Sequence, residues 1–144
     1  MYCEDYILRL VQQLVAAIAR IAGLNQRGAH DEALAVADRA WCELLDVPRE
    51  MLDAMDTPSL AAMLREPAKL RLAARLFVEE AHALASKGDP RLAAARLRRA
   101  LELFLEVHAT DPSEQDDAAI RDLLRVVPVE ILAPRYRAHA GAAA

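Results

Sequence analysis

The clearest indication of the fold is the stretch at residues 77–105, FVEEAHALASKGDPRLAAARLRRALELFL. Strong helix formers fill both sides of a short turn, Lys87-Gly88-Asp89. Gly88 can end the first helix in a left-handed cap, and Asp89 before Pro90 is a typical start for the second helix. The stretch therefore predicts two antiparallel helices joined by a tight turn.

The composition extends this prediction to the whole chain. Alanine (31) and leucine (22) dominate the 144 residues, whereas glycine occurs 4 times and aromatic residues 6 times. An all-α fold follows, and a collagen-like, disulfide-framed, disordered or glycine-rich nucleotide-binding chain is disfavoured. The length is typical of one domain, which we place at residues 1–139, with a disordered tail at 140–144.

Proline marks the expected helix starts, because a missing N–H costs nothing in the first turn. The six such prolines are Pro48, Pro58, Pro67, Pro90, Pro112 and Pro128. Thr57, Asp89 and Asp111 are good N-cap residues, and Glu114 would complete a capping box with Asp111. The expected helices run over residues 5–24, 30–45, 48–55, 58–64, 67–86, 90–109, 112–126 and 128–138.

An internal repeat relates the two halves of the chain. A shift of 60 residues places Gly28, Ala33, Ala37, Ala40 and Leu44 on Gly88, Ala93, Leu97, Ala100 and Phe104. Three of these pairs are identical, and the other two stay apolar. Small residues at these positions let antiparallel helices approach closely, so we expect a second helix pair near the N-terminus.

The second copy resembles a tetratricopeptide repeat, which is a pair of helices with a glycine-containing turn. The matching residues are Phe77, Ala81 and Leu84, the Lys87-Gly88-Asp89 turn, and Ala93, Leu97, Ala100 and Leu101. Glu80 and Ala81 stand where the family usually has leucine and glycine, and Pro112 comes later than the pattern expects. The resemblance implies tetratricopeptide-like helical hairpins packed as one right-handed helical array or bundle.

Over residues 1–107 the chain is also similar to a family of uncharacterised bacterial all-helical proteins with tetratricopeptide-like helix pairs. That family opens with Tyr-x-x-Asp-Tyr-Ile-Leu-Arg. The residues that carry the resemblance include Tyr2, Asp5, Tyr6, Ile7, Leu8, Arg9, Gly28, the Glu32-Ala33-Leu34 run and the Lys87-Gly88-Asp89 turn. The family has no assigned activity, so the resemblance supports the fold and makes the opening segment a candidate contact surface.

Ligands of tetratricopeptide arrays meet the concave face that is formed by the first helix of each pair. By this resemblance, the candidate partner-binding residues are Arg75, Val78, His82 and Ser86 in the second copy, and Val15, Ile18, Asn25 and Gln26 in the first. Two repeats are fewer than such arrays usually need. Two alternatives therefore stay open: an exposed groove, or one filled by the helices between Pro48 and Leu64.

The first expected helix is apolar on more than one face. One seam contains Ile7, Val11, Leu14, Ile18 and Ile21, and a second stripe contains Leu8, Val15 and Ala22. Such a helix either packs on two neighbours within its own domain or pairs with another copy of itself. The candidate self-association residues are Ile7, Leu8, Val11 and Val15.

No motif in the sequence indicates catalysis, a cofactor or a metal. The chain lacks G-x-S-x-G, a phosphate-binding glycine loop, and a cysteine with an interpretable histidine partner. Glu79 and His82 form one Glu-x-x-His pair, but the second pair that a di-iron bundle needs is missing. We therefore expect no enzymatic activity, no cofactor and no metal ligands. Trp41 is expected in the core.

Charge and targeting signals predict a cytoplasmic protein without nucleic-acid or membrane partners. The net charge is −4, and the densest basic stretch (Arg91, Arg96, Arg98 and Arg99) is either a solvated helix face or a site for an acidic peptide. The acidic N-terminus lacks a signal peptide, and Arg9, Arg20 and Arg27 interrupt the apolar runs. Cys3 and Cys42 stand alone, as expected for reduced thiols.

The leading functional hypothesis is a non-enzymatic protein–protein interaction module, an adaptor or scaffold. It would bind a protein or peptide segment, or self-associate as a homodimer through its helical surfaces. The alternative is a helical bundle that binds a small ligand or metal in its interior, in a site that includes Glu79 and His82.

Overall fold

The computed structural model describes residues 2–143, and every regular element in this range is helical. The elements are α1 (Tyr2–Gln26), α2 (His30–Arg39), the π-helical turn η1 (Ala40–Leu44), α3 (Arg49–Ala54), α4 (Thr57–Leu64), α5 (Pro67–Ser86), α6 (Pro90–Thr110), α7 (Glu114–Leu124), the 3₁₀ turn η2 (Val129–Ile131) and α8 (Pro134–Ala143). This confirms the all-α prediction.

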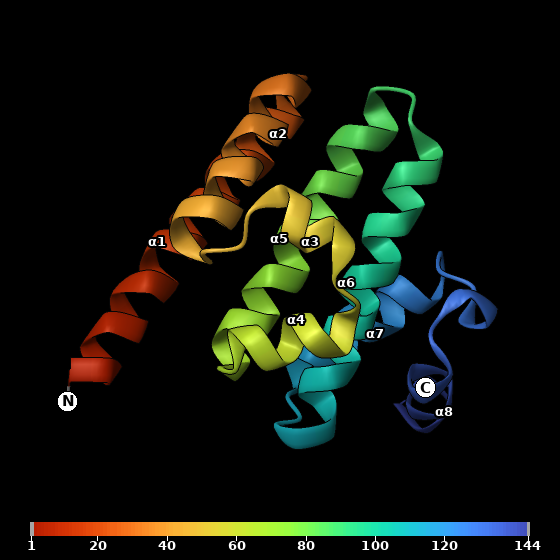
Figure 1. Cartoon of the computed structure of the whole chain (residues 1–144). Coiled ribbons are helices and arrows are strands. Elements are labelled where there is room, and N and C mark those ends of the chain that lie inside the picture. Colours follow the sequence, from red (N-terminus) through yellow and green to blue (C-terminus); the bar gives the residue numbers. More distant parts are fainter. Residues whose placement is uncertain (1, 144) are drawn as a thin grey trace.

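Two long hairpins form the frame of the molecule. In Figure 1, α1 lies beside α2 and α5 beside α6, with the short helices α3 and α4 in front of the second hairpin and α7 behind it. The hairpins meet through contacts of α5 with both α1 and α2. One hydrophobic cluster runs through the frame, from Leu10 in α1 to Ala140 in α8.

The turns of the two hairpins have the same backbone geometry at an offset of 60 residues. Gly28 and Gly88 have φ angles of 79° and 86°, in the left-handed region that favours glycine. The N–H of Gly28 donates to the carbonyl of Asn25 at 3.1 Å, and the N–H of Gly88 donates to the carbonyl of Ala85 at 3.1 Å. The next residue donates to a carbonyl five positions back in both turns, at 2.8 and 2.9 Å. Each glycine therefore ends a helix in the same way, as the sequence predicts.

Small residues lie at the close approaches of both hairpins. Ala33 and Ala40 of the first hairpin and Ala93 and Ala100 of the second are all buried. Trp41 is fully buried, and its ring centroid lies 4.7 Å from that of Phe77. The core position predicted for Trp41 is thus confirmed, and its ring joins the first hairpin to the second.

Several helix starts differ from the expected ones. Asp89 does cap α6, because its carboxylate accepts from the N–H of Leu92 at 3.2 Å. Helix α4, however, is capped by Asp56 rather than Thr57, and α7 is capped by Ser113 rather than Asp111. The capping box expected for Asp111 is therefore wrong. The Asp111 carboxylate instead pairs with Arg71 of α5 at 3.0 Å, which keeps it away from the first turn of α7.

The C-terminal region forms other elements than the single helix expected over residues 128–138. Pro128 precedes only the 3₁₀ turn, and the last helix starts at Pro134 and continues to Ala143, through residues expected to fray. Ala140 in this helix is buried, and Tyr136 donates a hydrogen bond of 2.7 Å to Glu106 of α6. The contacts with α6 thus hold this helix against the rest of the chain.

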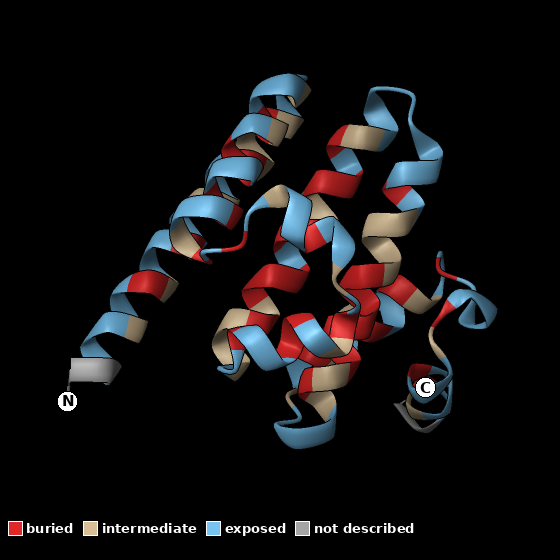
Figure 2. Ribbon diagram, in the orientation of Figure 1, coloured by how far each residue is buried: buried red, intermediate tan, exposed pale blue. Residues whose placement is uncertain are grey.

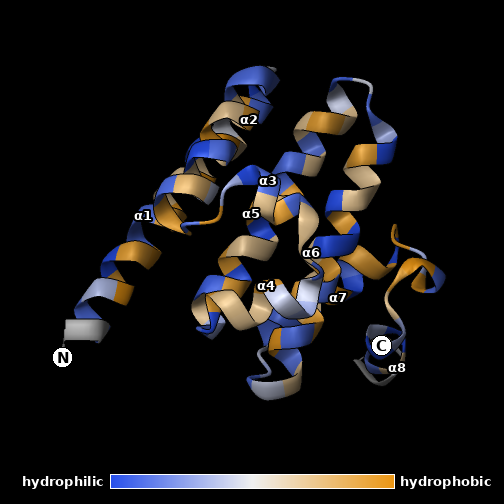
Figure 3. Cartoon of the chain, in the orientation of Figure 1, coloured by the Kyte–Doolittle hydropathy of each residue, from blue (hydrophilic) through white to orange (hydrophobic). Residues whose placement is uncertain are grey.

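Helix α1 is long, apolar and only partly covered. Beyond the grey end, Figure 2 shows mostly exposed residues on the N-terminal half of α1, and Figure 3 shows apolar residues on the same stretch. An 18-residue window within Glu4–Gln26 has a mean hydropathy of 1.5, and 22% of that window is buried, so this helix is long and apolar enough to cross a membrane. The expectation that the arginines leave no stretch of spanning length is therefore wrong. Length and composition alone establish no membrane crossing, since core helices meet the same criteria.

Candidate functional site: a groove between three helices

An open groove runs along α5, with α1 on one side and α7 on the other. We call it the α1–α7 groove. Its first part has a volume of about 520 Å³ and is lined by Val15, Ile18, Ala19, Ala22, Arg75, Val78, Glu79, Phe104, Ala119, Asp122 and Leu123. Its second part has a volume of about 510 Å³ and is lined by Val11, Ala68, Arg71, Leu72, Arg75, Phe104, Gln115, Asp116, Ala118 and Ala119. Because Arg75, Phe104 and Ala119 line both parts, the two form one groove.

Helical periodicity determines which α5 residues reach the groove. Arg71, Arg75, Val78 and Glu79 recur at intervals of three and four and lie on the face between α1 and α7. Phe77 and Glu80 are buried and contact Trp41 of the first hairpin instead. Helix α5 therefore presents one face to the groove and another to the core.

The groove contains few charged side chains, and only some of them form ion pairs. Arg75 is exposed and forms no ion pair with any residue in the described range 2–143. Glu79 is half-buried, and its Oε2 atom has no hydrogen-bond partner among those residues. Arg71 is paired at the other end of the groove, with Asp116 at 2.7 Å and Asp111 at 3.0 Å. The free guanidinium of Arg75 is thus available to an acidic group on an occupant.

The structure brings together only part of the predicted partner-binding set. Arg75 and Val78 line the groove, together with Val15 and Ile18 from α1. The remaining four residues lie beyond its lining: His82, Ser86 and Gln26 are exposed, and Asn25 is half-buried. Asn25 has a structural contact instead, because its side-chain amide donates to the carbonyl of Glu79 at 3.1 Å.

The groove is open rather than filled by the middle segment of the chain. Neither part of its lining includes a residue between Pro48 and Leu64. Helix α4 contacts α5 and α6, while α7 contacts α6. In Figure 1 the short helices and α7 lie on opposite sides of the second hairpin.

Sequence reasoning missed the α7 wall and Glu79 as groove residues. Ala119 and Leu123 are spaced by four, which is typical of an apolar helix face. In a tetratricopeptide-like array, α7 would follow α1 and α5 as the next inner helix. The apolar spacing of Ala119 and Leu123, taken together with this helix order, could have predicted that α7 forms a wall of the groove.

The predicted self-association residues occupy the open side of α1. Leu8 is 59% exposed and Val15 49% exposed, whereas Ile7 and Val11 are half-buried. The buried side of the helix is formed by Leu10, Leu14, Ile21 and Leu24. Helix α1 therefore has a core face and, beside it, an apolar side on which Leu8 and Val15 are exposed while Val11 also packs against the core.

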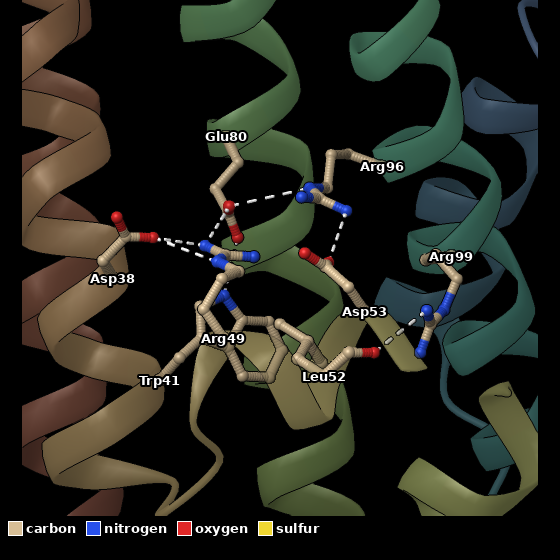
Figure 4. A network of polar contacts seen from close by, with 8 residues as sticks. All are labelled: Asp38, Trp41, Arg49, Leu52, Asp53, Glu80, Arg96 and Arg99. Atoms are coloured by element: carbon tan, nitrogen blue, oxygen red, sulfur yellow. Dashed lines mark hydrogen bonds and ion pairs between the residues drawn. The ribbon is translucent and has the colours of Figure 1, made fainter. Parts of the chain in front are cut away.

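A buried polar network lies on the opposite side of α5, around Glu80 (Figure 4). Glu80 is 2% exposed and accepts hydrogen bonds of 2.6 Å from Trp41 Nε1 and 2.6 Å from Arg49 Nη2. Arg96 Nε lies 3.8 Å from the same carboxylate. Burial raises the pKa of Glu80 above its usual range, and Arg49, Trp41 and Arg96 act against that rise.

This network connects the short helix α3 to the hairpins. Arg49 at its start bonds to Glu80 of α5, and Asp53 near its end pairs with Arg96 of α6 at 3.3 Å. Arg99 Nη1 donates to the Leu52 carbonyl at 3.5 Å, while its guanidinium lies 5.5 Å from the centre of the Phe77 ring. Because Arg99 is 7% exposed, the basic stretch that contains it is not simply a solvated helix face.

The histidines form no recognisable metal centre. His82 Nδ1 lies 3.7 Å from Glu79 Oε1, on an exposed turn of α5. His108 lies 3.1 Å from His139 and 3.0 Å from Asp117. Within residues 2–143, no group of three or more His, Cys, Asp and Glu side chains is placed to hold a metal ion. The interior ligand or metal site stays a prediction, which metal analysis of the purified protein tests.

Comparisons with known proteins identify no relative of this chain. No protein-family model, curated protein or solved structure matches the chain significantly.

Proposed function

We propose that this protein is a non-enzymatic interaction module, an adaptor or scaffold, that holds an α-helical segment of a protein in the α1–α7 groove. The observation that carries the proposal is the groove itself, an open channel with apolar residues on three helices. Proteins that bind helices in grooves take up apolar side chains at positions i, i+3 or i+4, and i+7 of the partner. The proposed partner is therefore an amphipathic helix.

The walls of the groove support a helical occupant. Ala19 and Ala22 on α1 and Ala118 and Ala119 on α7 carry short side chains, which allow the backbone of a third helix to approach closely. The apolar residues beside them can contact the apolar face of that helix. Burial of such a face is the dominant favourable contribution to this kind of association.

The charges of the groove suggest how the occupant is oriented. Arg75 lies near the middle of the groove, and Glu79 follows one helical turn later on the same face of α5. An acidic residue of the bound helix would lie beside Arg75, and a basic residue would lie beside Glu79. Charge pairs of this kind contribute mainly to the specificity of binding and its rate.

The repeated hairpin supports the same proposal. The identical turns at Gly28 and Gly88 are consistent with a tetratricopeptide-like array in which α1, α5 and α7 are the inner helices. The inner helices of such an array line its binding face. In this arrangement α3 and α4 belong to the outer side, where the Glu80 network holds α3.

Copurification from the native host, compared across matched variants, tests the proposal. Val15→Glu places a charge on the groove wall at a residue that is 49% exposed, and Val126→Glu is the control at a residue that is 64% exposed and outside the groove. We expect Val15→Glu to reduce the recovered partner at least ~10-fold, because the new carboxylate would put a charge where apolar side chains of the partner pack and would occupy Arg75 in place of the partner's acidic group. Equal recovery with the wild-type protein and both variants would show that the partner binds elsewhere.

A further inference from the structure

We propose that the helix held in this groove is α1 of a second copy of the chain, which enters antiparallel to the first. This inference rests on the proposed function and names the partner. It requires that α1 carry a face that pairs with itself, and that the charges beside this face complement each other across a two-fold axis.

The first requirement is met by a regular apolar seam on the uncovered face of α1. Leu8, Val11, Val15, Ile18 and Ala22 follow each other at intervals of three and four, the spacing of coiled-coil contacts. All five are exposed or half-buried. The fully buried side of α1 is formed by other residues, Leu10, Leu14, Ile21 and Leu24. Val11 and Ile18 also pack against the core with one side, but both stay partly exposed, so the seam keeps an open side for pairing after the chain has folded.

The seam is continuous with the groove. Val11, Val15, Ile18 and Ala22 form the α1 wall of the groove, and only Leu8 lies beyond it toward the N-terminus. A second α1 that packs on the seam around Val11 and Val15 therefore also lies over α5. By symmetry, the first α1 lies over the α5 of the second copy, and four helices enclose a shared apolar centre.

The charges select the antiparallel arrangement. Glu4 and Asp5 are exposed at the N-terminal end of the seam, and Glu4 lies four residues before Leu8 on the same face. Parallel, in-register pairing would place these acidic residues beside their own copies, which repel each other. In an antiparallel pair the acidic end of one helix reaches a more C-terminal part of the other.

The position of Arg75 sets the register. With the two-fold axis between Leu8 and Val11, Leu8 of each copy packs against Val11 of the other. Glu4 then lies at the level of Val15 of the opposite helix. The second α1 thus occupies the part of the groove around Val11 and Val15 and leaves the part around Ala22 and Glu79 open. Arg75 lines the groove at this level and has no ion partner of its own in residues 2–143. The dimer would thus contain two equivalent pairs between Glu4 of one copy and Arg75 of the other.

Sedimentation velocity of the purified full chain over a range of concentrations tests the dimer. The buffer is kept reducing because the chain contains two cysteines. We expect a dimer whose dissociation constant rises at least ~100-fold in Leu8→Glu, since the two-fold axis buries two new charges. Val126→Glu is the control, because its exposure of 64% is close to the 59% of Leu8. A wild-type monomer at all concentrations, or an unchanged dimer in Leu8→Glu, would overturn the proposal.

A charge exchange tests the register. Glu4→Arg and Arg75→Glu each place like charges together and should weaken the dimer ~10-fold, whereas the double variant should return to within ~3-fold of the wild type. Failure of the double variant to recover would overturn the antiparallel register. The two proposals can also be told apart. If sedimentation shows a wild-type monomer but Val15→Glu still recovers less partner from the host, the dimer proposal is overturned and the proposed function stands.

Discussion

The paired turns allow a quantitative test of the internal repeat. Gly28 and Gly88 have left-handed φ angles, and an added Cβ would meet no other atom within 4 Å at either position. The cost of Gly28→Ala or Gly88→Ala is therefore purely a backbone cost, on the order of 1–2 kcal/mol. Alanine also restricts the unfolded chain, which offsets roughly 0.4–1 kcal/mol. Each variant should lose about 1 kcal/mol of unfolding free energy.

Urea unfolding followed by circular dichroism measures this loss, with Gly23→Ala as the matched control. Gly23 lies inside α1 with the same open space around it, but its backbone is helical. Alanine should stabilise the protein there by ~0.5–1 kcal/mol, so the control has the opposite sign. A neutral or stabilising effect at Gly28 or Gly88, or a difference of more than ~1 kcal/mol between the two, would refute the equivalence of the turns.

Three further predictions concern single residues. Arg65 has a φ of 68° and an exposed side chain, so Arg65→Gly should raise the unfolding free energy by ~1 kcal/mol in urea titrations, and a loss would contradict backbone strain there. Trp41→Phe removes the hydrogen bond to Glu80 and should cost ~2–4 kcal/mol in the same assay, whereas a cost below ~1 kcal/mol would mean that this bond contributes little. Burial, together with Glu106, raises the pKa of Tyr136 in the folded protein. The neutral phenol therefore stabilises the fold fully below the usual tyrosine pKa of about 10, and this stabilisation is lost as the pH rises further. Tyr136→Phe should therefore unfold with a weaker dependence on pH between about 9 and 11.5, and identical profiles would exclude a role for this phenol.

Local sequence signals predicted most helices, because they act within a few residues. The Lys87-Gly88-Asp89 turn and Pro90 define the end of α5 and the start of α6, and both helices begin where expected. Prediction failed where distant contacts decided the outcome. Asp111 is a good cap by composition, but Arg71 lies forty positions away in sequence and takes its carboxylate.

The candidate groove was predictable on α5 and α1 but not on α7. Val15, Ile18, Arg75 and Val78 follow from helical periodicity and the repeat. The groove also needs a third wall, and the side of the second hairpin on which α7 packs is determined by tertiary contacts with α6. Glu80 is a second example. The sequence shows that it replaces the leucine of the tetratricopeptide pattern, but only the structure shows that it bonds to Trp41 and Arg49.

The helical character of the chain, the turns of its two long hairpins and the two apolar faces of α1 follow from the amino-acid sequence alone. These properties depend on backbone preferences and on the spacing of residues along one helix. Two features became known only from the folded structure: which side of α1 is buried in the core, and that α3 and α4 lie away from the groove. Both outcomes depend on packing between segments far apart in the chain, and spacing within a single helix carries no information about its neighbours.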